Sequence, residues 1–577
     1  MKRRAARPSA AVRRFQWRQR VVAGCLLFAA LLLAGRAVQL QILKADFLNR
    51  QAAARHVRVA KLSAHRGAIT DRNGEPLAVS TPVDSIWANP RELVNVPERI
   101  PDLARALGLD PQKLARRLTR NANREFIYLR RHMNPADAAK VTALNIPGVD
   151  LLREYRRYYP SGEVAGHLLG FTNIDDVGQE GLELAYDHWL AGQPGRKKVL
   201  KDRLGRVIED LEEIEPARPG RDLRLSVDLR IQYLAYRELK QAIATHHAAA
   251  GSVVVLDVRT GEVLAMVNQP SYNPNDRAQF DASHYRNRAI TDPLEPGSTL
   301  KPLVVAAALE SGRYHPDSHI DTSPGFVQIG AKLIEDEHNL GRIDLATLLA
   351  RSSNVGATKL AMSLEPEQLY GVLARFGLGR PTASGFPGES AGLLSHYSNW
   401  RAISQATLAY GYGLSGTPLQ LAQAYAILAA GGLHRPVSLL RVSDTPIPRR
   451  VIERSTADAV LAMLETVVSA DGTGRRAAVR GYRIAGKTGT ARKFAPGGYS
   501  EDRYIAVFAG IAPASQPRLA IVVVVDEPST GEYYGGTVAA PVFSNIAAGA
   551  LRILAIPPDN FSLPRDAVQT TLAARTQ

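Results

Sequence analysis

The sequence predicts an α+β protein in three parts: a single N-terminal transmembrane helix, an elongated α+β module, and a C-terminal domain in which an antiparallel sheet is sandwiched by helices. Three observations predict this. An apolar segment covers residues 21–43, turn signals and short apolar runs fill 44–222, and strand-like segments lie at both sequence ends of a helical stretch in 223–557. Strands on either side of a helical middle fit one sheet covered by helices.

The first part is a membrane anchor. Residues 21–43 are uncharged except for Arg36, and they are long enough to cross a bilayer core of ~30 Å at ~1.5 Å per residue. We expect Arg36 to reach the outer interface or to face a partner helix. A cleaved signal peptide is the alternative, because Gly35-Arg36-Ala37 resembles a cleavage site. The arginine in that site and the apolar run beyond it favour the anchor.

The charge pattern predicts how the anchor is oriented. The formal net charge is +17, and the basic tail of residues 1–20 has eight Lys and Arg and no acidic residue. Basic residues before a span predict a cytoplasmic N-terminus, so the rest of the chain after residue 43 is expected outside. No helix-turn-helix, zinc-finger or ribonucleoprotein pattern accompanies the basic charge, which argues against nucleic acid as a partner. The single cysteine, Cys25, lies in the span, so the exported part has no disulfide to form.

Residues 44–222 are charged and arginine-rich, and we call this predicted spacer the pedestal. An Asn-Gly turn inside 66–78, between short apolar runs, predicts a hairpin. A second turn is expected at 202–207, and 101–147 are expected to form short helices.

The C-terminal domain is expected to cover residues 223–557, with a polar tail at 558–577. Apolar spacing and turn residues define its elements. The expected helices cover 228–243, 301–311, 343–363, 404–430 and 456–470. The expected strands cover 223–227, 251–257, 263–267, 481–486, 504–511 and 519–526.

Three short motifs occur in this domain in a fixed order. They are Ser298-Thr299-Leu300-Lys301, Ser352-Ser353-Asn354 and Lys487-Thr488-Gly489-Thr490. Each alone is weak, but the order S-x-x-K, S-x-N, K-T-G, with gaps of roughly 50 and 130 residues, is the pattern of serine acyltransferases that react with penicillin.

Ser298 and Lys301 supply a nucleophile and a base. Three residues apart at a helix start, they lie on the same face. A serine hydroxyl reacts when a nearby base takes its proton. A lysine is such a base only if burial or cationic neighbours lower its pKa far below ~10.4, and we expect Lys487 in the same pocket to do so. The alternative is a capping serine with a solvated lysine.

Ser352 and Asn354 lie on a predicted loop between two helical stretches. Their hydroxyl and amide groups are suited to relaying a proton and holding a substrate carbonyl. A capping turn before a helix at 357–363 is the alternative, and both interpretations are compatible.

The K-T-G motif follows the strand-like run 482–486. A strand edge with Lys487, Thr488 and Thr490 offers N–H groups, a positive charge and hydroxyls for a carboxylate and an oxyanion. Gly489 lets a ligand approach the backbone. A basic edge strand with a turn glycine is the alternative.

Competing motifs point to other chemistry and are rejected. Gly388-Glu389-Ser390-Ala391-Gly392 fits the nucleophile elbow, which requires a strand before it and a helix after it, and its flanks predict a loop. His246-His247 point to different sides of a helix, and Glu335–His338 is more typical of a solvated acidic turn than of a metal site. No phosphate-binding or dinucleotide glycine pattern occurs. No metal and no cofactor are therefore predicted.

Over nearly its whole length the chain resembles the class B penicillin-binding proteins, and within them the division-specific septal branch. Asn354 in place of Asp favours that branch over the elongation-specific one, and no glycosyltransferase domain precedes the pedestal. Besides the three motifs, the resemblance rests on Arg66-Gly67-x-Ile69-x-Asp71-Arg72-x-Gly74, on Arg153, Tyr155, Arg157 and Tyr158 followed by Pro160 and Gly166, on Gly178-x-x-Gly181-Leu182-Glu183, on Gly411-Tyr412-Gly413 and on Tyr533-Tyr534-Gly535-Gly536-Thr537.

The resemblance implies a serine β-lactamase-like fold and a D,D-transpeptidase that cross-links peptidoglycan. Ser298 would attack the D-Ala–D-Ala bond, Lys301 would act as base, and Ser352 would pass a proton to the leaving amine. The implied substrate-binding residues are Asn354, for the donor amide, and Lys487, Thr488, Gly489 and Thr490, for the carboxylate. The N–H groups of Ser298 and Thr490 would form the oxyanion hole, and β-lactams would acylate Ser298.

The resemblance also implies partners and a location. The partners would be peptidoglycan stem peptides, β-lactams, a polytopic glycan polymerase and bitopic division proteins. The protein would be a single-pass inner-membrane protein with a periplasmic catalytic domain at the division septum. Three alternatives stay open: an elongation-type transpeptidase, a related hydrolase (D,D-carboxypeptidase or serine β-lactamase), and a non-enzymatic division scaffold or β-lactam sensor.

Overall fold

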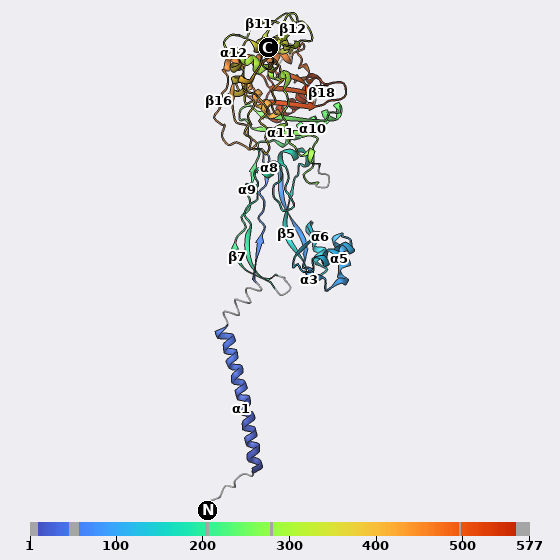
Figure 1. The fold of residues 1–577 in the computed structure, drawn as a ribbon, viewed down its shortest axis with the longest axis vertical. Helices are drawn as coiled ribbons and strands as arrows, with labels where there is room; N and C mark the ends of the chain where they lie inside the picture. Colours follow the sequence, from blue (N-terminus) through green and yellow to red (C-terminus); the bar gives the residue numbers. More distant parts are fainter. Residues whose placement is uncertain (1–9, 45–56, 202–206, 277–280, 496–497, 561–577) are drawn as a thin grey trace, which may run out of the picture. The chain divides into compact units, whose positions relative to one another are not determined.

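The structure, a computed structural model, describes residues 10–44, 57–201, 207–276, 281–495 and 498–560 (Figure 1). It divides into two compact units, each built from discontinuous segments. The first comprises Met1–Ala64, Pro82–Tyr155 and Gln193–Arg218, and the second His65–Thr81, Arg156–Gly192 and Pro219–Gln577. The predicted linear boundary at residue 222 stays a prediction, because the chain passes between the units several times.

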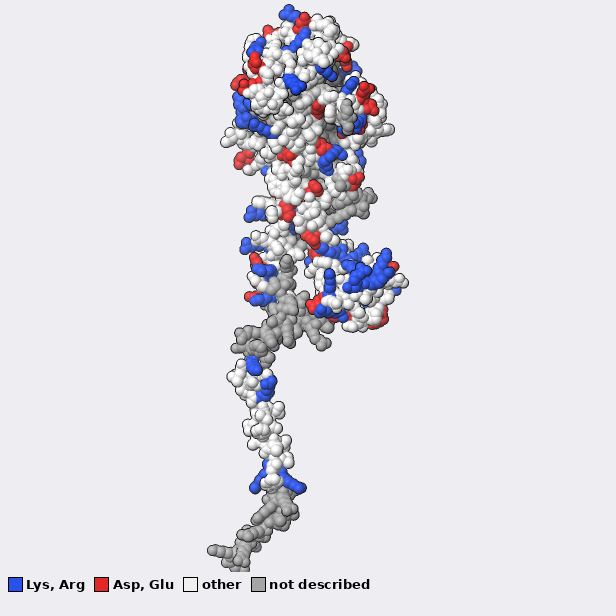
Figure 2. Space-filling view, viewed as in Figure 1, with Lys and Arg blue, Asp and Glu red and all other residues white. Residues whose placement is uncertain are grey.

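The first unit begins with the apolar helix. Helix α1 (Ala10–Val38) continues into a π-helical turn, η1 (Gln39–Leu43). In the described part of the chain, Trp17–Leu43 is the one helical segment long and apolar enough to cross a membrane. Figure 2 shows an uncharged stretch of this helix with basic residues at both ends. Arg36 donates to Gln39 Oε1 at 2.6 Å, which satisfies part of its guanidinium at one end of the span.

A small α+β body follows in the same unit. Strands β1 (Val57–Leu62), β6 (Gly195–Lys201) and β7 (Val207–Glu215) form an antiparallel sheet. Leu103, Leu107, Leu114 and Leu118 pack together because their helical spacing places them on one face of each helix. The predicted turn at 202–206 lies outside the described residues. The other elements are α3 (Pro90–Leu93), α4 (Ile100–Leu107), α5 (Pro111–Arg120), β4 (Ile127–Met133), α6 (Pro135–Thr142) and β5 (Val149–Tyr158).

The prediction of short helices throughout 101–147 is wrong at β4. This segment alternates between buried Ile127, Leu129 and Met133 and more exposed residues, which is the period of a half-buried strand. It pairs with the part of β3 (Pro76–Ala88) that belongs to this unit. The predicted hairpin at 66–78 is confirmed, since β2 (Ile69–Thr70) and β3 pair antiparallel.

The second unit is built on one antiparallel sheet with the strand order β10-β9-β19-β18-β17. These strands are β9 (Ala250–Asp257), β10 (Val263–Gln269), β17 (Ala485–Ala495), β18 (Gly498–Ala512) and β19 (Leu519–Asp526). Side chains alternate between the faces: Val253 and Val255 pack into one hydrophobic core, and Val254 and Leu256 into another. The predicted sheet sandwiched by helices is confirmed.

Two helices cover one face of the sheet, and a helical bundle covers the other. Helices α10 (Leu229–His246) and α19 (Gly535–Ile553) contribute Leu239 and Phe543 to one core, in which Phe543 packs against Phe508. On the opposite face, α12 (Lys301–Glu310), α17 (Pro418–Ala429) and α18 (Arg454–Val467) share a core. Helix α19 was not predicted, because Pro541 and several glycines interrupt its helical pattern.

The remaining elements of the second unit are short. The helices are α7 (Gly166–Leu169), α8 (Gly181–Ala185), α9 (Asp187–Leu190), α11 (Arg288–Thr291), α13 (Leu345–Ala350), α14 (Asn354–Met362), α15 (Pro366–Arg375) and α16 (Ala402–Leu408). The strands are β2, β8 (Leu223–Arg224), β11 (His319–Asp321), β12 (Phe326–Ile329), β13 (Lys332–Glu335), β14 (Arg342–Asp344), β15 (Leu433–His434) and β16 (Arg449–Arg450). Two predicted helices, 343–363 and 404–430, are therefore each broken by a loop, and those loops carry Ser352 and Gly411.

A buried ion network joins three segments of the second unit that are distant in sequence. Arg66 donates to Glu183 Oε2 at 2.8 Å and to Asp187 Oδ1 at 2.7 Å. Arg157 donates to Glu183 Oε1 at 2.6 Å and to the Gly67 carbonyl at 2.8 Å. Both arginines and Glu183 are almost completely buried. We call Arg66, Arg157, Glu183 and Asp187 the ion network. Arg66, Arg157 and Glu183 belong to the pedestal motifs of the sequence, and the network gives these three residues a structural role.

Candidate active site

Ser298 lies in a tight turn held at both sides by glycine contacts. Gly297–Leu300 form a 3₁₀ turn that leads into α12. The predicted helix start is therefore confirmed, and its first turn is 3₁₀-helical. Gly297 has φ +56°, and its N–H donates to the Gly411 carbonyl at 3.2 Å. A side chain at Gly411 would put its Cβ 2.0 Å from the Gly297 carbonyl oxygen. The glycines therefore let the two loops touch and fix the nucleophile turn.

Lys301 is one of two buried lysines in the site. Its side chain is fully buried, and Nζ donates to Asn354 Oδ1 at 2.8 Å and to Ser352 Oγ at 3.2 Å. Burial lowers its pKa well below the ordinary value of 10.5, and the positive charge of Lys487 lowers it further, while Asp336 acts in the opposite direction. Burial and a cationic neighbour are the two effects that lower the pKa of a lysine enough for it to act as a base.

The S-x-N motif stands where the predicted helix 343–363 breaks. Ser352 has φ +59°, a left-handed conformation that is uncommon for a residue with a side chain. Helix α14 starts at Asn354, earlier than the predicted 357, and Ser353 caps it by accepting from Gly356 N at 2.8 Å. The capping interpretation is therefore confirmed at Ser353, and its two neighbours contact Lys301; the catalytic interpretation of Ser352 and Asn354 stays a prediction.

The K-T-G motif lies inside an edge strand. Lys487 to Thr490 belong to β17, which starts at Ala485, so the predicted strand 482–486 ended too early. Because β17 pairs only with β18 in the sheet, one set of its backbone groups faces away from the sheet. Lys487 is fully buried, and desolvation lowers its pKa to about 7.

Gly489 and Thr490 touch protein groups on either side of this strand. A Cβ at Gly489 would lie 2.9 Å from the Pro296 carbonyl oxygen, so the glycine brings β17 against the nucleophile turn. This close contact between two protein segments is a stronger reason for a glycine at position 489 than the close approach of a ligand to the backbone, which we expected from the sequence. Thr490 Oγ1 accepts from Gly535 N at 3.0 Å, which joins the strand to the start of α19.

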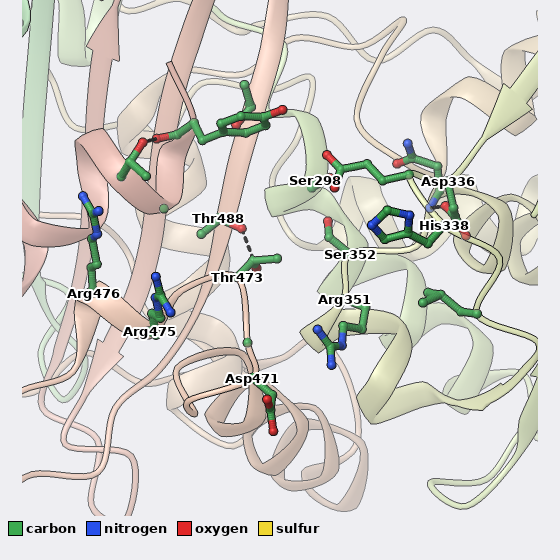
Figure 3. A pocket seen from close by; sticks show the side chains of 18 of the residues that line it. Ser298, Asp336, His338, Arg351, Ser352, Asp471, Thr473, Arg475, Arg476 and Thr488 are labelled. Atoms are coloured by element: carbon green, nitrogen blue, oxygen red, sulfur yellow. Dashed lines mark hydrogen bonds between the residues drawn. The ribbon is translucent and has the colours of Figure 1, made fainter. Parts of the chain in front are cut away.

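The three motifs meet at one cavity of about 770 Å³ (Figure 3). Of the predicted site residues, Ser298, Ser352, Asn354, Thr488 and Thr490 line it. Lys301 and Lys487 are buried behind this lining and reach it through hydrogen bonds to Ser352, Asn354 and Thr488.

Several lining residues were not predicted. Thr473 lies beside the K-T-G motif, with its Oγ1 2.9 Å from Thr488 Oγ1. Arg351, Arg475, Arg476 and Tyr534 also line the cavity. Thr473 belongs to no motif, so the sequence held no signal for it, whereas Tyr534 lies in the motif Tyr533-Tyr534-Gly535-Gly536-Thr537, to which no site role was assigned.

The rejected motifs take non-catalytic places. Ser390 lies in a loop without a flanking strand or helix, as predicted, and its Oγ accepts from Gly392 N at 3.2 Å. Asp336, in the acidic turn, accepts from Ser353 Oγ at 2.5 Å and from Val355 N at 3.1 Å. This carboxylate therefore caps the start of α14, instead of being solvated as predicted. The described residues contain no group of three or more potential metal ligands.

Family profiles match most of the chain. One described as "Penicillin binding protein transpeptidase domain" matches residues 251–548, and one described as "Penicillin-binding Protein dimerisation domain" matches 61–225. With an antiparallel sheet between helices and a serine–lysine site, these matches define the class. The chain belongs to the class B penicillin-binding proteins.

Individual relatives narrow the resemblance. "Peptidoglycan D,D-transpeptidase FtsI" of Escherichia coli strain K12 is 47% identical over 549 residues, covering 94% of this chain and 93% of the relative. "Probable peptidoglycan D,D-transpeptidase PenA" of Neisseria meningitidis serogroup A is 41% identical over 545 residues, covering 93% and 92%.

Solved structures agree with this placement. The transpeptidase domain of penicillin-binding protein 3 from Burkholderia pseudomallei has a TM-score of 0.54 at 43% identity, covering 58% of this chain and 98% of that one. A peptidoglycan synthetase from Bifidobacterium adolescentis has a TM-score of 0.70 at 26% identity, covering 88% and 98%.

Proposed function

We propose that the chain is a peptidoglycan D,D-transpeptidase that cross-links stem peptides during septal wall synthesis through an acyl-enzyme on Ser298, and that β-lactams target the same serine. One observation carries the proposal: Ser298 opens onto a cavity backed by two buried lysines whose pKa values are both lowered. A neutral Lys301 is a base, and the Escherichia coli relative that is 47% identical is named a peptidoglycan D,D-transpeptidase.

In the proposed acylation, Ser298 Oγ attacks the carbonyl carbon of the penultimate D-alanine. Lys301 takes the hydroxyl proton, directly or through Ser352, and Ser352 passes it to the departing amine of the terminal D-alanine. Asn354 holds the donor amide. The backbone N–H groups of Ser298 and Thr490 stabilise the oxyanion as it forms.

The proposed carboxylate site uses Lys487, Thr488, Gly489 and Thr490. Thr488 Oγ1 lies 3.3 Å from Lys487 Nζ, so a carboxylate that accepts from the threonine hydroxyl lies near a positive charge. The same site would take the carboxylate of a penicillin, which explains why a β-lactam competes with the peptide.

The organisation of the chain supports a membrane-anchored wall enzyme. We propose residues 44–222 as pedestal and 223–557 as transpeptidase domain, held by a span with a cytoplasmic N-terminus and a periplasmic catalytic domain. The eight basic residues before the span support this orientation. A septal location, with a polytopic glycan polymerase and bitopic division proteins as partners, follows from the resemblance to the division-specific branch.

Labelling with a fluorescent penicillin tests the nucleophile. The full chain in detergent is expected to become labelled covalently, and Ser298→Ala is expected to lose labelling while it keeps the thermal unfolding midpoint. Equal labelling of both proteins would contradict the assignment of Ser298.

Product analysis separates transpeptidase from carboxypeptidase. With a pentapeptide donor and an acceptor stem peptide, we expect cross-linked dimers together with free D-alanine. Release of D-alanine without dimers would show a hydrolase, and absence of both products with intact penicillin labelling would favour a β-lactam sensor.

A further inference from the structure

Three arginines line the cavity that contains Ser298. They are Arg351, Arg475 and Arg476, and all are exposed. Within the described residues, none of the three guanidinium groups forms an ion pair, and none donates a side-chain hydrogen bond to the protein. Three cations without protein partners, gathered on the wall of a catalytic cavity, form a surface suited to an anionic ligand; we call them the arginine cluster.

Hydrogen bonds tie this cluster to one side of the catalytic site. Thr473 N donates to the Ala350 carbonyl at 3.2 Å, which joins the segment before Arg475 to the residue before Arg351. Thr473 Oγ1 lies 2.9 Å from Thr488 Oγ1. Figure 3 shows Arg475 and Arg476 on the Thr473 and Thr488 side of the cavity, and Arg351 below Ser352. Arg475 and Arg476 therefore lie on the side of the proposed carboxylate site, and Arg351 lies next to the S-x-N motif.

That side of the cavity is where the acceptor enters. In the proposed reaction, which this inference presupposes, the terminal D-alanine has its carboxylate at Thr488 and leaves from the same side of the acyl carbon. The acceptor amine then attacks that carbon: a C–N bond forms, the C–Oγ bond to Ser298 breaks, and the amine proton returns to the serine oxygen. The body of the acceptor peptide consequently occupies the space that the arginine cluster lines.

The hydrogen-bonding groups around the cavity suit an acidic acceptor. Three carboxylates also line it: Asp336, Glu337 and Asp471. Asp336 keeps its charge, but its oxygens accept from Ser353 and from the start of α14, whereas the three guanidinium groups keep their donors open to a ligand. Guanidinium groups bind carboxylates through two parallel hydrogen bonds. The cavity of about 770 Å³ is within the ~300–1,000 Å³ of pockets that hold a ligand of several residues' size.

We propose that Arg351, Arg475 and Arg476 bind a carboxylate of the acceptor stem peptide, remote from its attacking amine, and thereby make the enzyme selective for an acidic acceptor. The arginines are assigned to the aminolysis step. The groups proposed for acylation by a donor or a penicillin are Ser298, Lys301, Ser352, Asn354 and the K-T-G motif, so removal of the arginines is expected to slow aminolysis more than acylation.

A competition between matched acceptors tests this proposal. The full chain in detergent is acylated with a stem-peptide thioester, so that the second step is measured. Two acceptors compete, identical except that the carboxylates remote from the attacking amine are free in one and amidated in the other. The pair is made with lysine and with diaminopimelate, and the more reactive diamino acid is used.

The wild type is expected to prefer the acceptor with free carboxylates. Arg351→Gln and the double variant R475Q/R476Q are each expected to lower kcat/KM for this acceptor by about 10-fold or more, because each removes charge-assisted hydrogen bonds to the carboxylate. The amidated acceptor should be unaffected. The preference should also shrink as salt is raised, because salt screens exposed charges.

A matched control and the penicillin reaction keep the outcomes distinct. Arg480→Gln removes the same charge from an exposed position in the same segment, outside the cavity lining, and should preserve the preference. Equal loss with both acceptors, or no preference in the wild type, would overturn the role of the arginine cluster. Failure of the wild type to be acylated by penicillin would instead overturn the proposed function.

Discussion

Two sets of basic side chains are buried in the second unit, and they differ in whether they form an ion pair. In the ion network, Arg66 and Arg157 share Glu183 at 2.7 Å and 2.6 Å. In the active site, Lys301 and Lys487 donate to carbonyl, amide and hydroxyl oxygens and, among the described residues, form no ion pair. Burial acts to lower the pKa of Arg66, but Glu183 and Asp187 outweigh it, and the pKa is raised. The unpaired lysines have lowered pKa values.

The difference distinguishes a structural use of buried charge from a chemical one. Removing one partner of a buried ion pair is strongly destabilising, because the other charge then stays unpaired in a medium of low dielectric constant. A buried lysine without an acidic partner destabilises the folded protein when the lysine is charged. The same burial lowers the pKa of the lysine, and a lysine that loses its proton near neutral pH can act as a base.

The largest expected effect is on acylation. Lys301→Met should slow acylation of Ser298 by penicillin by about 10²–10⁴-fold, the usual contribution of a general base. Thermal stability should stay equal or rise, because an unpaired buried cation is removed. Stopped-flow labelling and a thermal melt measure the two quantities. A large loss of stability together with a small loss of rate would place Lys301 with the structural cations.

The reverse pattern is expected for the ion network. Glu183→Gln leaves Arg66 and Arg157 buried beside a neutral amide, which should cost about 3–5 kcal/mol of stability. The folded fraction should be acylated at the wild-type rate. Denaturant titration followed by penicillin labelling at low temperature checks both points. If the variant is as stable as the wild type, the network contributes nothing that an amide cannot replace.

A third prediction concerns pH. Lys487 has a folded pKa of about 7, below its ordinary value near ~10.4 in the unfolded chain. Between these values the unfolded state binds more protons, so stability rises with pH, by at most ~1.4 kcal/mol per unit. Lys487→Met should therefore be more stable than the wild type at pH 7, and the difference in melting temperature should narrow toward pH 10. A constant difference would show that Lys487 keeps its proton.

The smallest effect is expected from an exposed pair. Arg91 and Glu125 lie 2.8 Å apart with side chains 54% and 73% exposed. Because solvent screens such pairs, Arg91→Ala should cost below about 1 kcal/mol. A thermal melt beside Glu183→Gln provides the comparison. A cost similar to that of Glu183→Gln would mean that burial is not what separates the two ion pairs.

Local patterns carried much of the prediction from sequence. Continuous apolar runs predicted β9, β18 and β19, and the three motifs selected the residues that line the cavity. The remainder depends on long-range contacts. The break at Ser352 requires a left-handed backbone that no propensity favours, and α19 contains Pro541. Thr473 and the arginine cluster reach the site through a bond to Ala350, which has no signature in sequence.

The glycine contacts around the nucleophile turn restrict how resistance to inhibitors can evolve. A methyl group at Gly411 or Gly535 would meet a backbone oxygen at 2.0 Å or 2.3 Å, and backbone cannot rotate out of the way as a side chain can. Substitutions that exclude a drug while the enzyme still makes cell wall must therefore arise among side chains on the cavity rim, such as Tyr534. An inhibitor whose contacts depend on the backbone position that these glycines fix would leave a population few escape routes.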